Sequence, residues 1–189
     1  VENSMISKVG NLAFSVSGFL KVKELPFSAM RKIFSDYTVQ ESISLYATLG
    51  GLPGLWRLLY PQNSAEENLI RLLLQRNSFL PELMIKWLSE ESRADGRHGK
   101  LNDMYAHTGF SRAKISVYLK NLMELELVEK VLPGTYEICN AFVRFYFCFL
   151  FPHQTSERTE GSTFYEKYIR EEYNDFQLLT YRRICQEVL

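Results

Sequence analysis

The chain has few residues that could support metal or disulfide chemistry, because its 189 residues include only three cysteines and three histidines. Cys139, Cys148 and Cys185 show no metal-ligand spacing, and an odd number cannot form a complete disulfide set. We expect them to be reduced residues in or near the core, as in cytoplasmic proteins. Since no nucleophile with a neighbouring base and no clustered carboxylate pair is visible, the chain alone is not expected to be an enzyme.

Net charge is also lacking, because 22 basic residues balance 22 acidic ones. No long-range field therefore draws the chain toward nucleic acid or a membrane surface. The most apolar run, residues 138–151, is interrupted by Asn140 and Arg144 and is too short to span a bilayer. The sequence thus predicts a cytoplasmic protein without a membrane partner.

Apolar residues make up 46% of the chain and aromatic residues 14%, which predicts a substantial core. Two capping boxes, Thr38-x-x-Glu41 and Ser64-x-x-Glu67, mark helix starts. A further helix from Pro81 is expected to place Leu83, Met84, Trp87 and Leu88 in the core. The other expected elements are a short strand ending at Pro26, a helix at 28–35, a short helix after Pro53, and C-terminal helices at 164–172 and 175–188.

The stretch 101–137 has the pattern of a helix-turn-helix followed by a hairpin. A short helix is expected at 101–107, a turn at Thr108-Gly109-Phe110, and a second helix at 111–125. Gly109 can take the positive φ of a sharp turn, and Ser111 stands at an N-cap position. The buried face of the second helix is expected to be Ile115, Leu119, Leu122 and Leu125.

After Leu125 the apolar pattern changes to alternation, which is typical of strands. Pro133-Gly134 is a turn signal, so a β-hairpin is expected at about 126–138. An aromatic run follows at 142–151 and is expected to be core rather than a base-stacking surface.

In a winged helix the second helix of the pair usually enters the DNA major groove. Basic residues concentrate between Arg93 and Lys120, whereas Glu124, Glu126, Glu129 and Glu137 make the hairpin region acidic. Any contact with double-stranded DNA is therefore expected on the first segment. Because the exposed face also carries Ala113 and Val117, a protein contact remains an alternative. The candidate DNA-binding residues are Arg97, Lys100, Ser111, Arg112, Lys114, Ser116 and Lys120.

Five sequence elements follow one another along the chain: Leu25-Pro26-Phe27-Ser28, Gly50-Gly51-Leu52-Pro53, the stretch 101–130, Phe142–Pro152 and Tyr181–Leu189. In that order they resemble the C-terminal half of archaeal and bacterial AAA-type ATPases of the STAND class, which join a P-loop core to a helical lid and a winged helix. The resemblance implies that Gly51 and Pro53 match a Gly-x-Pro element whose proline lies against adenine.

The chain departs from this family in two ways. It contains no G-x-x-x-x-G-K-[ST] loop, so alone it is expected to hold no cofactor and to hydrolyse no ATP; ATP would bind only with an ATPase core. In the family's terminal domain an acidic residue usually follows an aromatic one. In Tyr181-Arg182-Arg183-Ile184-Cys185 that position is occupied by Arg182, and this difference disfavours a nuclease function for the C-terminal segment.

The predicted fold is mainly α, with a helical lid, a winged helix with a small β-hairpin wing, and C-terminal helices. The expected segments are a lid-like region at 1–77, a winged-helix domain at 78–152, and a C-terminal segment at 153–189 that begins a further domain. The predicted function is a DNA-binding or regulatory module of such an ATPase. The alternatives are a stand-alone winged-helix DNA-binding protein and a protein-interaction module, with an ATPase core or another protein as the partner.

Overall fold

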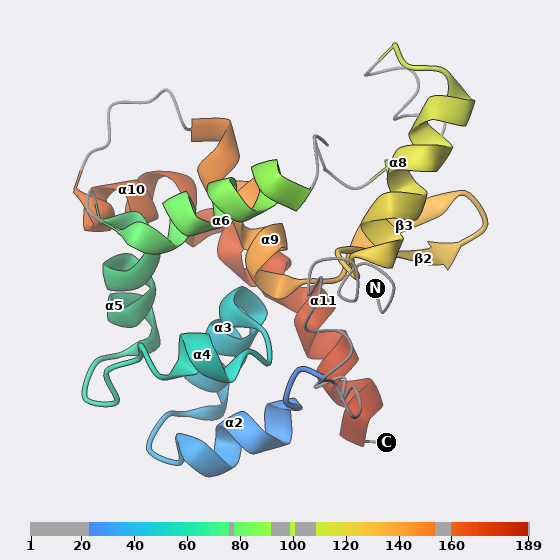
Figure 1. Cartoon of the computed structure of the whole chain (residues 1–189). Helices are drawn as coiled ribbons and strands as arrows, with labels where there is room; N and C mark the ends of the chain where they lie inside the picture. The colour runs from blue at the N-terminus through green and yellow to red at the C-terminus, as the bar shows by residue number, and fades with distance from the viewer. Residues whose placement is uncertain (1–22, 76–77, 92–98, 101–108, 154–159, 189) are drawn as a thin grey trace, which may run out of the picture.

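The structure, a computed structural model, describes residues 23–75, 78–91, 99–100, 109–153 and 160–188. It is mainly helical with one small antiparallel sheet, so the expected mainly-α fold class is confirmed (Figure 1). The helices are α2 (Phe27–Ile33), α3 (Val39–Leu49), α4 (Pro53–Trp56), α5 (Ala65–Leu69), η2 (Ile70–Leu74), α6 (Phe79–Glu91), α8 (Arg112–Glu124), α9 (Ala141–Phe145), η3 (Tyr146–Leu150), η4 (Phe151–His153), α10 (Gly161–Tyr168) and α11 (Arg170–Val188). The strands are β1 (Gly99–Lys100), β2 (Val128–Leu132) and β3 (Thr135–Ile138).

Both predicted capping boxes form, and they set the starts of α3 and α5. The Thr38 side chain accepts from the backbone N–H of Glu41, whose Oε2 accepts from the backbone N–H of Thr38 at 3.0 Å. Ser64 and Glu67 repeat this exchange at α5. Each box satisfies two of the N–H groups that a helix start leaves unpaired. Local sequence therefore determines these two boundaries.

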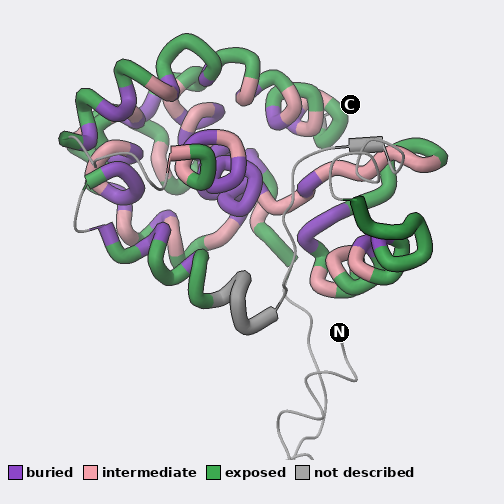
Figure 2. Tube along the Cα trace, turned by 90° about the horizontal axis from the view of Figure 1, so that it is seen from above, coloured by how far each residue is buried: buried purple, intermediate pink, exposed green. Residues whose placement is uncertain are grey.

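The helices α3, α9 and α11 pack together and form the centre of a helical body. The rings of Phe145 and Phe149 lie 5.2 Å apart, and both rings approach Tyr173 and Phe176 of α11. Figure 2 shows the buried residues gathered in the interior of this body. The aromatic run is thus mostly core, as expected, although Phe151 at its end is exposed.

The sheet has the strand order β1-β3-β2, with every neighbouring pair antiparallel. The strands β2 and β3 form a hairpin whose register places Val128 opposite Ile138 and Lys130 opposite Tyr136. Gly134 takes a φ of +75° in the connecting turn, a conformation that glycine adopts without a steric penalty. The hairpin expected at about 126–138 is confirmed.

Other sequence expectations need correction. Residues 23–26, the described end of the expected N-terminal strand, form no strand, although the Leu25 N–H donates to the Gly51 carbonyl at 2.8 Å. The break between the last two helices falls at Ile169 instead of near residue 173, so Tyr173 lies inside α11. In α6, Met84 is buried as expected, but Leu83 is 55% exposed. The side chains of Trp87 and Leu88 and the expected helix at 101–107 lie outside the described residues.

Buried residues of the described chain form one large cluster that extends from Met30 to Tyr173. All three expected segments contribute to it, and their division at residues 77 and 152 stays a prediction. Among the described helices, none combines the length and the apolar character needed to cross a membrane.

Candidate functional site

The helix α8 and the hairpin lie to one side of the helical body (Figure 1). Gly109 has a φ of +66° just before the helix, and the Ser111 side chain accepts a hydrogen bond from the Lys114 N–H at 3.3 Å. The expected helix at 111–125 is therefore confirmed, with Ser111 as its N-cap. Its start is determined by a local hydrogen bond and a backbone turn that glycine permits.

One face of α8 is buried and the other is open to solvent. Ile115 and Leu119 are buried, while Leu122 and Leu125 are half-buried. Val117, on the opposite face, is 57% exposed. The predicted buried face is thus confirmed, and a continuous outer surface of the helix is left for a partner.

The basic candidates on α8 divide into two groups along this surface. Arg112, Ser116 and Lys120 are all exposed and recur every four residues, so they follow one stripe of the helix. Lys114 lies away from that stripe, with its Nζ 4.0 Å from the ring centroid of Phe110 and 5.9 Å from that of Tyr118. Such cation–π contacts hold the ammonium group beside the two rings while leaving it charged.

Lys120 forms an ion pair with Glu124 one turn further along α8. Lys120 Nζ lies 3.9 Å from Glu124 Oε1, and both side chains are largely exposed, so solvent screens the pair. Of the remaining candidates, Lys100 lies in β1 and its side chain is not among the described ones, while Arg97 lies outside the described residues. The structure places five of the seven candidates on α8 or at its N-cap: Ser111, Arg112, Lys114, Ser116 and Lys120.

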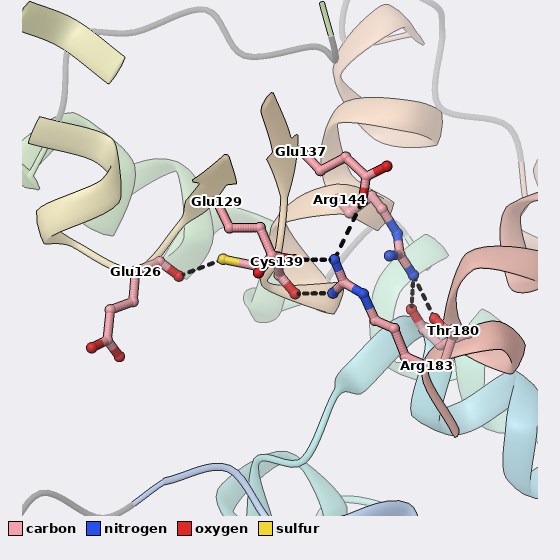
Figure 3. A network of polar contacts seen from close by, with 8 residues as sticks. Glu126, Glu129, Glu137, Cys139, Arg144, Thr180 and Arg183 are labelled. Atoms are coloured by element: carbon pink, nitrogen blue, oxygen red, sulfur yellow. Dashed lines mark hydrogen bonds and ion pairs between the residues drawn. The ribbon is translucent and has the colours of Figure 1, made fainter. Parts of the chain in front are cut away.

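The acidic charge of the hairpin is partly offset by a residue from the far end of the chain. The sheet register places Glu129 directly opposite Glu137, an arrangement of like charges that destabilises a hairpin. Arg183 of α11 lies between the two carboxylates, forms an ion pair with each, and donates to the Cys139 carbonyl at 3.2 Å (Figure 3). Sequence reasoning identified the two glutamates as repulsive to DNA but missed this bridge.

Both residues of the expected Gly-x-Pro element, whose proline would lie against adenine, are accounted for by the local structure. A Cβ on Gly51 would lie 2.1 Å from the Leu25 carbonyl oxygen, so the close passage of residues 24–25 requires glycine. Pro53 occupies the first turn of α4, where its missing N–H costs no hydrogen bond, and it is exposed. The nucleotide role of Gly51 and Pro53 stays a prediction.

Arg144 of α9 is a second residue whose role the sequence did not predict, because it stood out only as an interruption of the apolar run 138–151. It is 2% exposed, and its Nη2 donates to Thr180 Oγ1 at 2.6 Å and to the Ala47 carbonyl at 3.4 Å. Burial, reinforced by the nearby Arg183 cation, lowers the pKa of Arg144 to about 10, so the guanidinium stays charged at neutral pH. A charged residue inside an aromatic run was the only sequence signal of this site.

Within the described residues, no three His, Cys, Asp or Glu side chains gather closely enough to hold a metal ion.

The chain is similar to the uncharacterized protein MJECL04 of Methanocaldococcus jannaschii, with 25% identity over 193 aligned residues that cover 92% of this chain. The alignment covers 43% of that relative, so the chain spans less than half of its length. No protein-family model and no solved structure matches the chain. The resemblance to STAND-class ATPases stays a prediction.

Proposed function

We propose that residues from α6 to β3 form a winged helix that contacts double-stranded DNA through the outer face of α8. We further propose that the chain is the lid and winged-helix half of a STAND-class ATPase. The first proposal is supported by the geometry of α8 and the sheet. The second is supported by the order of the resembling sequence elements.

The observation that carries the winged-helix proposal is the strand order. The short strand β1 follows α6 and pairs with β3, the second strand of the hairpin. Along the chain, α8 lies between β1 and the hairpin. In winged helices this arrangement leaves one helix exposed beside the hairpin, and that helix enters the major groove. Here the exposed helix is α8, and its buried residues Ile115 and Leu119 face inward.

The charge on α8 supports a moderate, mostly electrostatic affinity. Arg112, Lys114 and Lys120 are exposed cations, and Ser116 adds a hydroxyl on the same stripe as Arg112. With Lys100 and Arg97 as flanking contacts, three to five phosphates would be neutralised. The slope of log affinity against log salt would then be about −3 to −5. Ala113 and Val117 are exposed and would supply the apolar contacts to thymine methyl groups.

The test is to replace Arg112, Lys114 and Lys120 together by alanine and to measure binding to a random duplex by fluorescence anisotropy at low salt. The matched control replaces three exposed basic residues outside α8 by alanine: Lys32, Arg57 and Arg182. This control removes the same amount of positive charge as the α8 variant. We expect the α8 variant to lose binding and the control to retain most of it. Equal losses in both variants would exclude α8 as the DNA contact and leave only a nonspecific charge effect.

The ATPase half of the proposal predicts no activity from this chain alone. Without a phosphate-binding loop, Pro53 supplies only a surface on which adenine can stack. We expect no detectable ATP hydrolysis and no tight ATP binding by calorimetry. Tight ATP binding would reveal a phosphate site in this chain and would contradict the proposed division between an ATPase core and a lid.

A protein-interaction module is the second candidate, and exposed apolar residues favour it. Val117 lies at the centre of the outer face of α8, Phe110 precedes the helix, and Leu132 is exposed at the end of β2. The partner would be the ATPase core of the same assembly. If the parent chain binds no duplex even at low salt, this candidate replaces the DNA proposal, and Val117→Asp is then expected to weaken binding to the core.

A further inference from the structure

Arg144 is charged and buried, yet it lacks the partner that a buried cation normally has. Its Nη2 is satisfied by Thr180 and the Ala47 carbonyl, whereas its Nε is buried and has no hydrogen-bond partner. No carboxylate of the described residues forms an ion pair with it; the ring of Phe176 lies 4.8 Å from the guanidinium carbon. Buried charges in proteins are usually paired, and exceptions of this kind often mark a ligand site.

A pocket of about 260 Å³ lies beside this guanidinium. It occurs where the end of β3 meets α9, α3 and α11, and its lining includes Arg144, Thr180, Arg183 and the Tyr46 ring. Figure 3 shows the two arginines approaching this joint from α9 and α11. Arg144 and Arg183 therefore both line one small cavity, and the Nε of Arg144, which is closed to solvent, has no hydrogen-bond partner.

We propose that this pocket binds a compact anionic group, a carboxylate or phosphate carried by a small molecule. Planar guanidinium groups recognise such groups by paired N–H···O hydrogen bonds. Arg144 would contribute its charge, and Arg183, which also pairs with Glu129 and Glu137, would contribute the second cation. The proposal is independent of DNA binding and of the ATPase resemblance.

The carboxylates around the pocket restrict the ligand to one with a single anionic group. Glu24 lines the pocket, but its Oε2 accepts from the Gly51 N–H at 3.0 Å and its Oε1 from the Asn140 amide at 3.4 Å. Glu187 also lines the pocket from α11 and is exposed. Together with Glu129 and Glu137, which pair with Arg183, these two charges would repel an extended polyanion such as an oligophosphate, whereas one compact group would be held between the two arginines.

The experiment measures thermal unfolding of the full chain in sodium chloride, sodium acetate and sodium phosphate at equal ionic strength and pH 7. We expect a saturable rise in the melting temperature with acetate, with phosphate or with both, because a ligand that binds only the folded state stabilises it. A rise with acetate alone identifies a carboxylate ligand, and a rise with phosphate alone identifies a phosphate ligand. If neither anion stabilises the chain more than chloride does, the proposal is overturned.

Three variants localise the effect. Arg144→Met keeps most of the side-chain volume and is expected to abolish the saturable rise. Arg183→Gln is expected to raise the half-saturating concentration by about tenfold or more, the loss typical of one charge-assisted hydrogen bond. Arg170→Gln is the control, because Arg170 pairs with Glu66 and Glu166 and does not line the pocket. A parent-like response in Arg144→Met overturns the proposal.

Because a change at Arg144 could prevent folding, a second measurement uses the unmodified chain. The Nε–H signal of Arg144 in a ¹⁵N NMR spectrum is expected to shift in a saturable way as the effective anion is added. The Nε–H signal of Arg170 is expected to stay constant. An Arg144 signal that does not move while the melting temperature rises would place the anion elsewhere and refute the assignment.

Discussion

The helices α3 and α8 are similar in length but differ sharply in how much of each is buried. Six of the eleven residues of α3 are buried, including the polar Ser42 and Thr48. In α8 only two of thirteen residues are buried, Ile115 and Leu119. The comparison separates a scaffold helix, whose surface is covered by other elements, from a helix that presents most of its surface to solvent.

The difference arises from their neighbours and not from their starts. Each helix has an N-cap whose side chain accepts a hydrogen bond, Thr38 for α3 and Ser111 for α8. However, α3 packs against α2, α5, α9 and α11, while α8 packs mainly against β2. Most of the α8 surface is therefore open to solvent, whereas most of α3 is covered by neighbouring helices.

The largest expected effect is a truncation in the aromatic core that covers α3. Phe145 is among the largest fully buried side chains, so Phe145→Ala is expected to lower the free energy of unfolding by about 3–5 kcal/mol. The matched truncation on α8, Val117→Ala, removes an exposed side chain and is expected to change it by less than about 0.5 kcal/mol. Urea unfolding monitored by circular dichroism measures both. Similar losses in the two variants would show that α8 is covered in solution.

A smaller effect is expected at the end of α3, where residues 24–25 pass close to the chain. Gly51→Ala would place a Cβ against the Leu25 backbone, and we expect a loss of about 1–3 kcal/mol in the free energy of unfolding. Gly54→Ala is the control, because no atom lies within 4 Å of a Cβ built there. Since Gly54 is helical, its replacement is expected to be neutral or to stabilise by about 0.4–1 kcal/mol. Thermal unfolding compares the two, and equal stability would argue against the close passage.

The smallest effect concerns the dependence of the two N-caps on pH. Hydrogen bonds from the Thr38 backbone and side chain lower the pKa of Glu41 below its usual 4.5. The ionised Glu41 carboxylate therefore contributes fully to the free energy of unfolding above pH 4.5. This contribution is lost as the pH falls through the lowered pKa of Glu41. In α8 the corresponding position is Lys114, so no such carboxylate is present.

Glu41→Gln is accordingly expected to make the free energy of unfolding less sensitive to pH below about 4.5. The change is expected to be well under about 1 kcal/mol, because solvent screens the Glu41 carboxylate. Hydrogen exchange in acid should show α3 fraying earlier in the parent chain than in the variant, while α8 behaves alike in both. An unchanged acid profile in Glu41→Gln would show that the capping box contributes no pH dependence.

Short-range sequence signals predicted much of this fold correctly. The capping boxes, the N-cap at Ser111, the positive φ of Gly109 and the turn at Gly134 each depend on a few neighbouring residues. The periodic apolar residues of α8 and the aromatic run also identified core positions, because burial of apolar side chains dominates folding. Leu83 was the exception, since helical spacing defines a face but does not show whether another element covers it.

Long-range contacts could not be predicted in the same way. Arg183 lies 54 residues from Glu129 in the chain, and only the packing of α11 beside the hairpin brings the two together. The break at Ile169 was missed because the sequence around it carries no strong stop signal, while Arg170, the first residue of α11, pairs with the distant Glu66.

The sequence by itself determined where most helices begin, the existence of the hairpin and the basic character of α8, since these depend on residues within a few positions of one another. Only the tertiary structure decided which helix faces stay exposed, that Arg183 bridges two glutamates of the hairpin, and that Arg144 lies charged beside a pocket. The physical reason is that the free energy of a charge depends on its solvation and its neighbours, and both are supplied by segments distant in the chain.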